Sequence, residues 1–246
     1  MFSQSHSRGR GHRTWHPDSL IADSSYPLNV ALKKMTRTCT LSLIGLTIFL
    51  VAPGAVAQQA TAPAPDYFPL RVGDSWTYRS TNGDTQYSLR VLSEEKQADR
   101  TIRYEVEKLA GAKILASFSK ADGWVLMHSE RYPEHEGLEA KYEPARQYLK
   151  NPLRAGSQWG WKGEDYTKTE IEEMNQVVGP EDVTVPAGKF RAMKVVSTVG
   201  GAAAPLTRTS WYADGVGLVK SMTESGQIKY GWELADYSFK KKNPGK

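Results

Sequence analysis

The sequence predicts an all-β protein in which two duplicated antiparallel meanders form one curved sheet or open barrel of the β-clam kind. Apolar and polar residues alternate over most of the chain after residue 66, as they do in strands that bury one face. Short turn sequences with Gly, Asn or Asp separate these segments. Two phrases also occur twice in the same order, which indicates a tandem duplication.

The two repeated phrases set the expected organisation of the fold. The first starts at Pro69 and returns at Pro152, and both copies keep Pro-Leu-Arg, a glycine and a tryptophan. The second starts at Ala121 and returns at Ala213, so the second copy holds nine additional residues between the phrases. We place these residues near the Val-Pro-Ala-Gly segment, 185–188, where a tight turn is expected.

The chain is expected to contain a single folded domain, residues 67–238. Its two repeats cover 67–130 and 151–238. An Ala/Pro-rich linker, 58–66, precedes the domain, and a basic tail, 239–246, follows it and is expected to be disordered.

The first repeat is expected to hold about five strands. Alternation is clear over Tyr87–Val91 and Ile102–Val106 and weaker over Ile114–Phe118. The segment 131–151 between the repeats carries prolines and many charges, which exclude a long helix. We expect only a short strand there, near 138–142.

The second repeat follows the same plan, and its helical signal is poor. Thr167–Gln176 alternates weakly, but it aligns with the strand at 85–92, so it is predicted to be a strand. A hairpin is expected at Pro186-Ala187-Gly188. The remaining strands are expected at Leu206–Tyr212, Val216–Thr223 and Ile228–Leu234.

The N-terminal part resembles an export signal. Residues 35–57 combine a basic start, an apolar run and a small-residue cleavage site, which is typical of a signal peptide. The apolar run, Cys39–Val51, is 13 residues long, short of the roughly 20 that span a bilayer. We therefore expect cleavage, no stable membrane span afterwards, and a periplasmic or secreted protein. Residues 1–34 are interpreted as a mis-assigned, disordered extension, although Met1 rather than Met35 remains an alternative start.

The charge of the chain argues against nucleic-acid binding. The full sequence has 32 basic and 27 acidic residues, a net charge of +5. Residues 1–57 hold six of the basic and two of the acidic residues, so 26 and 25 remain. A near-neutral domain lacks the basic face that nucleic acid requires. Cys39 is the only cysteine, so the exported part has no disulfide.

The sequence shows no convincing catalytic, metal or cofactor site. His128 and His135 are the only histidines after residue 57, and they do not form the two-histidine helical zinc pattern. His128 aligns with Lys220 in the second repeat and is expected to face solvent, and His135 is expected in a solvated loop. Glu170 and Glu172 would share one face of a strand, which leaves a carboxylate-dependent hydrolase as an alternative.

Two aromatic pairs are the candidate ligand-binding residues. Trp76 with Tyr78, and Trp159 with Trp161, are spaced two apart, so each pair lies on one face of its strand. They fit either an ordinary core or an apolar cleft between the repeats that accepts a lipid.

We therefore expect a non-enzymatic binding module for a lipid or other apolar ligand, or for an envelope protein. The alternatives are the hydrolase and a structural or assembly protein of the cell envelope.

Three segments resemble landmarks of the TapB-like family, a group of bacterial secreted proteins of unknown function: Tyr67–Tyr78, Val185–Phe190 and Trp211–Lys220. The resemblance covers most of residues 66–238 and implies an exported β-rich domain, often a lipoprotein. This chain differs from that pattern, because it has no cysteine at the cleavage site. The family supplies no catalytic residues, and its general look suggests a curved sheet like that of periplasmic lipoprotein carriers.

Overall fold

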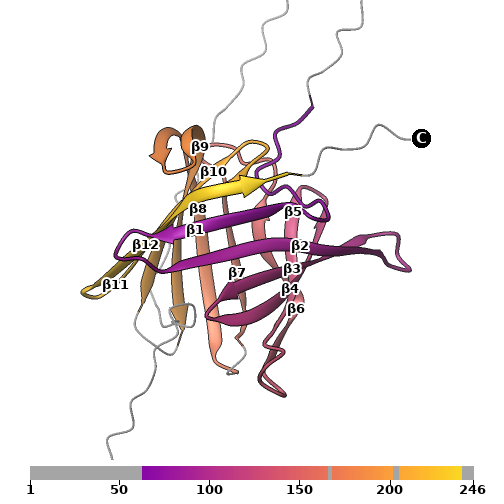
Figure 1. Cartoon of the computed structure of the whole chain (residues 1–246). Helices are drawn as coiled ribbons and strands as arrows, with labels where there is room; N and C mark the ends of the chain where they lie inside the picture. Colours follow the sequence, from indigo (N-terminus) through magenta and orange to yellow (C-terminus); the bar gives the residue numbers. More distant parts are fainter. Residues whose placement is uncertain (1–62, 166–167, 202–204, 240–246) are drawn as a thin grey trace, which may run out of the picture. The chain divides into compact units, whose positions relative to one another are not determined.

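The computed structural model describes residues 63–165, 168–201 and 205–239 (Figure 1). The predicted extension and signal peptide, most of the predicted linker and nearly all of the predicted basic tail lie outside these residues. The described part contains strands and no helix, and therefore no helix that could span a membrane. The strands are β1 Ser75–Ser80, β2 Gln86–Lys96, β3 Ile102–Ala110, β4 Ala112–Ala121, β5 Trp124–Arg131, β6 Glu139–Lys150, β7 Gln158–Glu164, β8 Glu170–Val185, β9 Gly188–Gly201, β10 Leu206–Ala213, β11 Gly217–Ser225 and β12 Ile228–Ser238.

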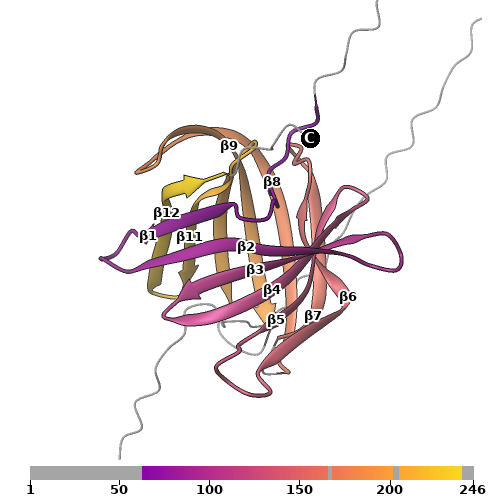
Figure 2. The same cartoon turned by 45° about the vertical axis from the view of Figure 1, so that its right-hand side comes forward.

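All twelve strands belong to one antiparallel sheet with the order β6-β5-β4-β3-β2-β1-β12-β11-β10-β9-β8-β7. Each strand pairs with its neighbour in the chain, except at β6 and β7 in the middle. The first and last strands pair instead, from Ser75 opposite Ser238 to Ser80 opposite Trp232. The sheet curls until β6 and β7 lie beside each other, at the right of Figure 2. The predicted fold class, two meanders in an open barrel, is confirmed.

The curled sheet has two walls, one from each half of the chain. In Figure 1, β1 and β2 run across the view in front of the steeper β7 and β8. One hydrophobic core joins both walls, and valines from each half are fully buried in it, among them Val91, Val125, Val177 and Val219. The alternating pattern thus places one face of each strand in the barrel interior.

The hairpin predicted at Pro186-Ala187-Gly188 is confirmed. Val185 of β8 pairs with Gly188 of β9, which leaves a two-residue turn. Gly188 has a φ of +134°, a conformation that favours glycine. The corresponding hairpin of the first half, β2–β3, is shorter. β8 and β9 have 16 and 14 residues, whereas β2 and β3 have 11 and 9.

The segment between the repeats differs from the prediction. β6 is a twelve-residue strand that includes Pro144, whereas only a short strand near 138–142 was expected, and the first half has six strands rather than five. A proline cannot donate to a sheet ladder, but β6 pairs only with β5 and has an open edge. The pairing with β5 is also interrupted between Met127 and Ser129, near this proline.

Candidate binding cavity

The barrel interior contains a partly open, mainly apolar cavity of about 230 Å³. Side chains from both halves line it, so neither half forms it alone. The apolar lining includes Phe68, Leu70, Trp76, Tyr78, Val106, Ile114, Phe118, Met127, Ile171, Val199 and Leu206. A cavity of about 150 Å³ lined by Leu, Ile and Phe binds benzene, so the volume of this one is sufficient for an apolar group of at least that size.

A second, polar cavity of about 130 Å³ adjoins the first. Seven residues line both: Tyr87, Lys108, Arg146, Tyr148, Arg208, Tyr212 and Leu218. The two cavities therefore adjoin each other inside the barrel, with these seven side chains at their border. We call them the apolar chamber and the polar chamber.

One row of polar side chains crosses the wall of the polar chamber. Asn175, Ser197, Arg208, Thr223 and Tyr230 are successive register partners on β8, β9, β10, β11 and β12, and all five line this chamber. Directly opposed side chains on neighbouring strands have Cβ atoms about 4.5–5.5 Å apart. The register therefore places amide, hydroxyl, guanidinium and phenol groups in a continuous line, which we call the polar row.

A buried ion pair crosses from β6 to β8. Nε and Nη2 of Arg146 donate to Oε2 of Glu173 at 2.9 and 2.7 Å. The two side chains are only 14% and 7% exposed. The guanidinium also lies over the rings of Tyr148 and Trp161, 5.7 Å from each centroid. This pair fixes the position of the cation at the border of both chambers.

Tyrosine hydroxyls add neutral donors to the interior. Tyr142 donates to Oε2 of Glu130 at 2.8 Å, and burial together with this carboxylate raises the pKa of Tyr142. Burial also raises the pKa of Tyr148 and Tyr212, although the charge of Arg208 opposes the rise. These phenols therefore stay protonated and remain able to donate.

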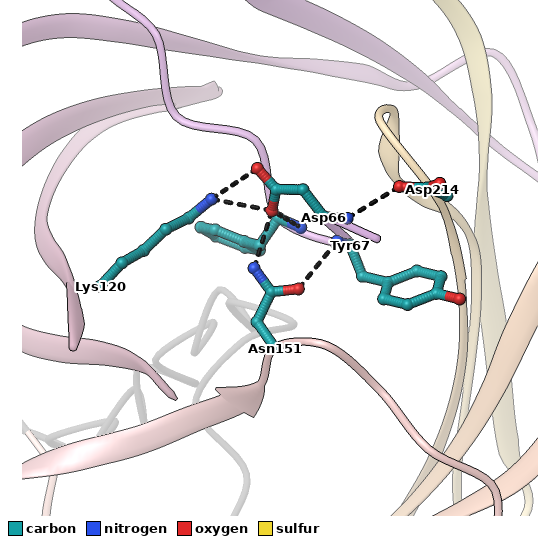
Figure 3. A network of polar contacts seen from close by, with 6 residues as sticks. Asp66, Tyr67, Lys120, Asn151 and Asp214 are labelled. Atoms are coloured by element: carbon teal, nitrogen blue, oxygen red, sulfur yellow. Dashed lines mark hydrogen bonds and ion pairs between the residues drawn. The ribbon is translucent and has the colours of Figure 1, made fainter. Parts of the chain in front are cut away.

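One end of the barrel is crossed by the segment that leads into β1. Both carboxylate oxygens of Asp66 accept from Nζ of Lys120 at 2.8 Å, and Nδ2 of Asn151 donates to the same side chain at 2.7 Å (Figure 3). The backbone N–H of Asp66 donates to Oδ1 of Asp214, and that of Gly215 donates to the Asp66 carbonyl. Asp66 thus connects a first-half strand with a second-half turn.

This connection also positions part of the cavity lining. Phe68 and Leu70 lie two and four residues after Asp66 and line the apolar chamber, where Phe68 packs against Phe118 and Tyr148. Burial would raise the pKa of the Asp66 carboxyl, but hydrogen bonds from Lys120 and Asn151 outweigh it and hold this pKa below its usual value. Asp66, the last residue of the predicted linker, is therefore already fixed to the barrel by hydrogen bonds.

The two predicted aromatic pairs lie in different places. Trp76 and Tyr78 line the apolar chamber, and their side chains donate to the carbonyls of Val216 and Leu218 at 2.8 Å each. Trp159 and Trp161 are equally buried, but they lie where β7 faces β6.

The second pair bonds to the backbone of β6. The indole of Trp159 donates to the Gln147 carbonyl at 3.0 Å, and that of Trp161 donates to the Pro144 carbonyl at 3.4 Å. The two indoles of β7 thus connect the two open edges of the sheet, β6 and β7. A ligand-binding role for the four aromatic residues stays a prediction.

The histidines and carboxylates that the sequence brought forward do not converge. His128 is half-buried rather than solvent-facing, and its Nε2 is hydrogen-bonded to Ser119 Oγ at 2.8 Å. Burial, and then the charge of Arg103, lower the pKa of His128. His135 is exposed in the β5–β6 loop. Glu170 and Glu172 lie exposed on the outside of β8. The described residues contain no group of three or more His, Cys, Asp or Glu side chains that could hold a metal.

The polar residues of the interior were missed by sequence reasoning. In the first eight residues of β8 the buried positions are Ile171, Glu173, Asn175 and Val177, so every second side chain is buried but two of the four are polar. The two-residue spacing of these four positions could have indicated that Glu173 and Asn175 face the interior, on the same side as Ile171 and Val177. Arg146 had no such signal, because its segment was not predicted as a strand.

The fold and the interior place the protein in a structural class: single-domain proteins with one nearly closed, barrel-like antiparallel sheet and a cavity in two parts inside it. The chain belongs to the DUF3108-like family, which matches residues 94–226, from the end of β2 to the turn after β11. The more specific TapB-like resemblance stays an expectation. Comparison with curated proteins gave no match.

Two solved structures are similar to the chain. One is described as a candidate lipoprotein from Parabacteroides distasonis, with 14% identity, a TM-score of 0.47, and coverage of 72% of this chain and 100% of that chain. The other is described as a candidate exported protein with a YmcC-like fold from Bacteroides fragilis, with 16% identity, a TM-score of 0.47, and coverage of 71% and 100%.

Proposed function

We propose that this protein is a non-enzymatic binding module that holds a hydrophobic ligand inside its barrel. The observation that carries the proposal is the apolar chamber, which both halves line. Side chains just fill a barrel of about eight strands, and the diameter grows with strand number. A sheet of twelve strands therefore has interior space that its own side chains leave open.

The apolar surface of this space supports a ligand. Removing apolar surface from water contributes about 25 cal/mol per Å², and most of the chamber's lining is apolar. A ligand that fills the chamber would bury this surface, and tight binding would raise the apparent stability of the fold.

The proposed site of action is the cell envelope. The signal-like segment 35–57 supports export to the periplasm or beyond. There, a lipid or another apolar molecule is the ligand we favour, and an envelope protein is the partner that would deliver or receive it.

The test is binding of N-phenyl-1-naphthylamine, a neutral apolar fluorophore. The purified domain should raise its fluorescence with saturation. Val199→Phe adds bulk inside the apolar chamber and should weaken binding at least tenfold. Val178→Phe is the matched control, because Val178 is 54% exposed on the neighbouring strand β8, and it should bind as the original protein does.

Circular dichroism and thermal melting check that both variants fold. If folded Val199→Phe binds the fluorophore as tightly as Val178→Phe, the chamber is not the binding site and the proposal fails. If Val199→Phe does not fold, Ala116→Leu tests the same chamber with a smaller increase in volume.

A further inference from the structure

We propose that the ligand is an uncharged amphiphile whose head group carries adjacent hydroxyl groups, as a glyceryl group does. The head group would lie in the polar chamber while the apolar chain fills the apolar chamber. This inference rests on the proposed function, because it names the class of ligand for the same interior. It also goes further, since the apolar chamber alone would not distinguish a hydroxylated lipid from a fatty acid or a hydrocarbon.

The position of the two chambers is the first observation. They share seven lining residues, so an extended molecule can reach from one chamber into the other. Most of the apolar chamber is lined by apolar side chains, whereas the lining of the polar chamber includes the hydroxyl groups of Ser197, Ser210, Ser221 and Thr223. A molecule that occupies both chambers therefore needs an apolar end and a polar end.

Two of these four hydroxyl groups are the second observation. Ser197 and Ser210 are each hydrogen-bonded to another side chain of the interior. Ser221 and Thr223 have no side-chain hydrogen bond to any residue that the structure describes, although they are only 7% and 4% exposed. Buried hydroxyl groups in folded proteins usually have a hydrogen-bond partner. A polar group of a ligand placed beside these two would supply one.

Ser221 and Thr223, which we call the hydroxyl pair, are neighbours on one strand. They lie two residues apart on the buried face of β11. With a rise of about 3.3 Å per residue, such positions are roughly 7 Å apart. Ser221 is the register partner of Trp232 on β12, which also lines the polar chamber. The pair can therefore bind two hydroxyl groups of one small head group, whose carbon atoms would pack against the indole.

The charged groups of the polar chamber favour an uncharged head group. Arg146 is paired with Glu173. Lys108 lies 5.0 Å from the centroid of the Tyr87 ring, and both Lys108 and Arg208 have interaction partners in the protein. The hydroxyl pair remains available to a ligand. A hydroxyl group both donates and accepts, so a hydroxylated head group can pair with it without bringing a further charge into the interior, where an unpaired charge is costly.

The experiment compares two uncharged ligands with the same chain, 1-O-dodecylglycerol and its 2,3-di-O-methyl ether, as competitors of N-phenyl-1-naphthylamine. The methyl groups of the ether remove both hydroxyl donors and keep the oxygen atoms. The original protein should prefer the diol about tenfold or more, because each neutral hydrogen bond contributes a factor of about five.

Substitutions in the hydroxyl pair should reduce this preference. Thr223→Val removes one hydroxyl group at nearly constant volume and should lower the preference by about threefold or more, and Ser221→Ala should act similarly. The double variant should retain a preference of about twofold or less. Thr198→Val is the matched control, because Thr198 is exposed on β9, and it should keep the full preference. A full preference in the folded double variant would overturn the inference.

Thermal melting of the ligand-free variants separates binding from a structural role. Because the hydroxyl pair has no side-chain hydrogen bond to another described residue, neither single substitution should lower the melting temperature. A clear decrease or a failure to fold in one variant would remove that residue from the head-group site, and the other variant then decides. A decrease in both would overturn the inference.

Further competitors identify the kind of head group and separate the two proposals. If dodecanoate binds more tightly than the diol, the head group is an anion and the inference is wrong. If free glycerol displaces the diol but not the neutral fluorophore, the polar chamber binds a free polyol and the amphiphile assignment is wrong. If the fluorophore binds and the diol competes no better than its ether, the inference fails and the proposed function stands. If none of them binds, the proposed function itself fails.

Discussion

The two junctions between the halves of the barrel are built in different ways. At the β12–β1 junction, six residue pairs from Ser75–Ser238 to Ser80–Trp232 form a backbone ladder. At the β6–β7 junction, no pair of residues in these fully described strands is in ladder register. There the contacts are made by side chains: the indoles of Trp159 and Trp161 on β6 carbonyls, and the Arg146–Glu173 ion pair.

The repeated tryptophans show what this difference means. Trp76 is the second residue of β1 and donates to the carbonyl of Val216, just before β11. Trp159 holds the same place in the repeat, and its ring lies edge-on to Trp124, which occupies the equivalent of Val216 in the first half. The same residue type thus lines a cavity where a ladder already closes the wall, and helps to close the wall where no ladder exists.

The largest effect is expected from breaking the buried ion pair at the β6–β7 junction. Glu173→Ala leaves Arg146 without its carboxylate in a buried position, which should lower the free energy of unfolding by about 3–5 kcal/mol. Glu170→Ala on the same strand removes an exposed carboxylate paired with Lys162 and should cost under about 0.5 kcal/mol. Urea unfolding of both variants provides the measurement. Similar losses in the two would show that the buried pair adds nothing to this junction.

The second effect concerns local opening of the two junctions. Amides in the β5–β6 and β7–β8 ladders should exchange with deuterium at least tenfold faster than those in the β1–β12 ladder, about 1.4 kcal/mol in opening free energy. The reason is that β6 and β7 each have only one ladder partner. Hydrogen exchange with mass spectrometry resolves these segments. Equal protection would mean that side chains secure the junction as firmly as a ladder does.

A smaller effect is expected from the indole hydrogen bond alone. Trp159→Phe keeps most of the apolar volume but removes the donor to the Gln147 carbonyl, which should cost about 1 kcal/mol. Trp76→Phe removes the equivalent donor at the ladder-closed side and should cost a similar amount. Only Trp159→Phe should also speed exchange in β6 and β7. Faster exchange in both variants would remove the distinction between the junctions.

The smallest effect concerns pH and the Asp66 contacts. The pKa of this carboxyl is lower in the folded chain than its usual value near 3.8, so its stabilising contribution is present above that value and is lost as pH falls through the folded pKa. Because the side chain is 42% exposed, the contribution should stay below about 1 kcal/mol.

Unfolding midpoints at pH 7 and pH 3 measure this contribution. Asp66→Asn should reduce the loss of stability between the two pH values. Asp182→Asn, which removes an exposed carboxylate on the outer surface, should keep the full loss. An identical pH response in Asp66→Asn and the original chain would contradict the role assigned to Asp66.

The fold class could be predicted from local sequence patterns, whereas the residues that line the interior could not. Period-two alternation and turn residues were sufficient for most strands and for the turn at 186–187, because each depends on neighbouring residues. β6 was underestimated, because Pro144 is tolerated only on an edge strand, and which strand forms the edge is a property of the whole sheet.

The candidate site depended on contacts between distant strands. Arg146 and Glu173 are 27 residues apart and meet only when the barrel curls. The polar row exists only in the register of five strands, so no local pattern marks Arg208 or Thr223 as neighbours. Interior positions also admit polar residues when a cavity lies beside them, and this weakened the alternation on β8.

The circular strand order has a mechanical consequence. Each junction has one kind of connection: β12 and β1 share a ladder without a direct peptide link, and β6 and β7 share a peptide link, residues 151–157, without a ladder. Parting β6 from β7 would break the indole bonds, the buried ion pair and some core packing between the walls, but it would leave every strand paired with at least one neighbour. The two halves of the barrel would then rotate about the β1–β12 ladder, which would act as the hinge. A ligand too wide for either end of the barrel could leave the interior between β6 and β7.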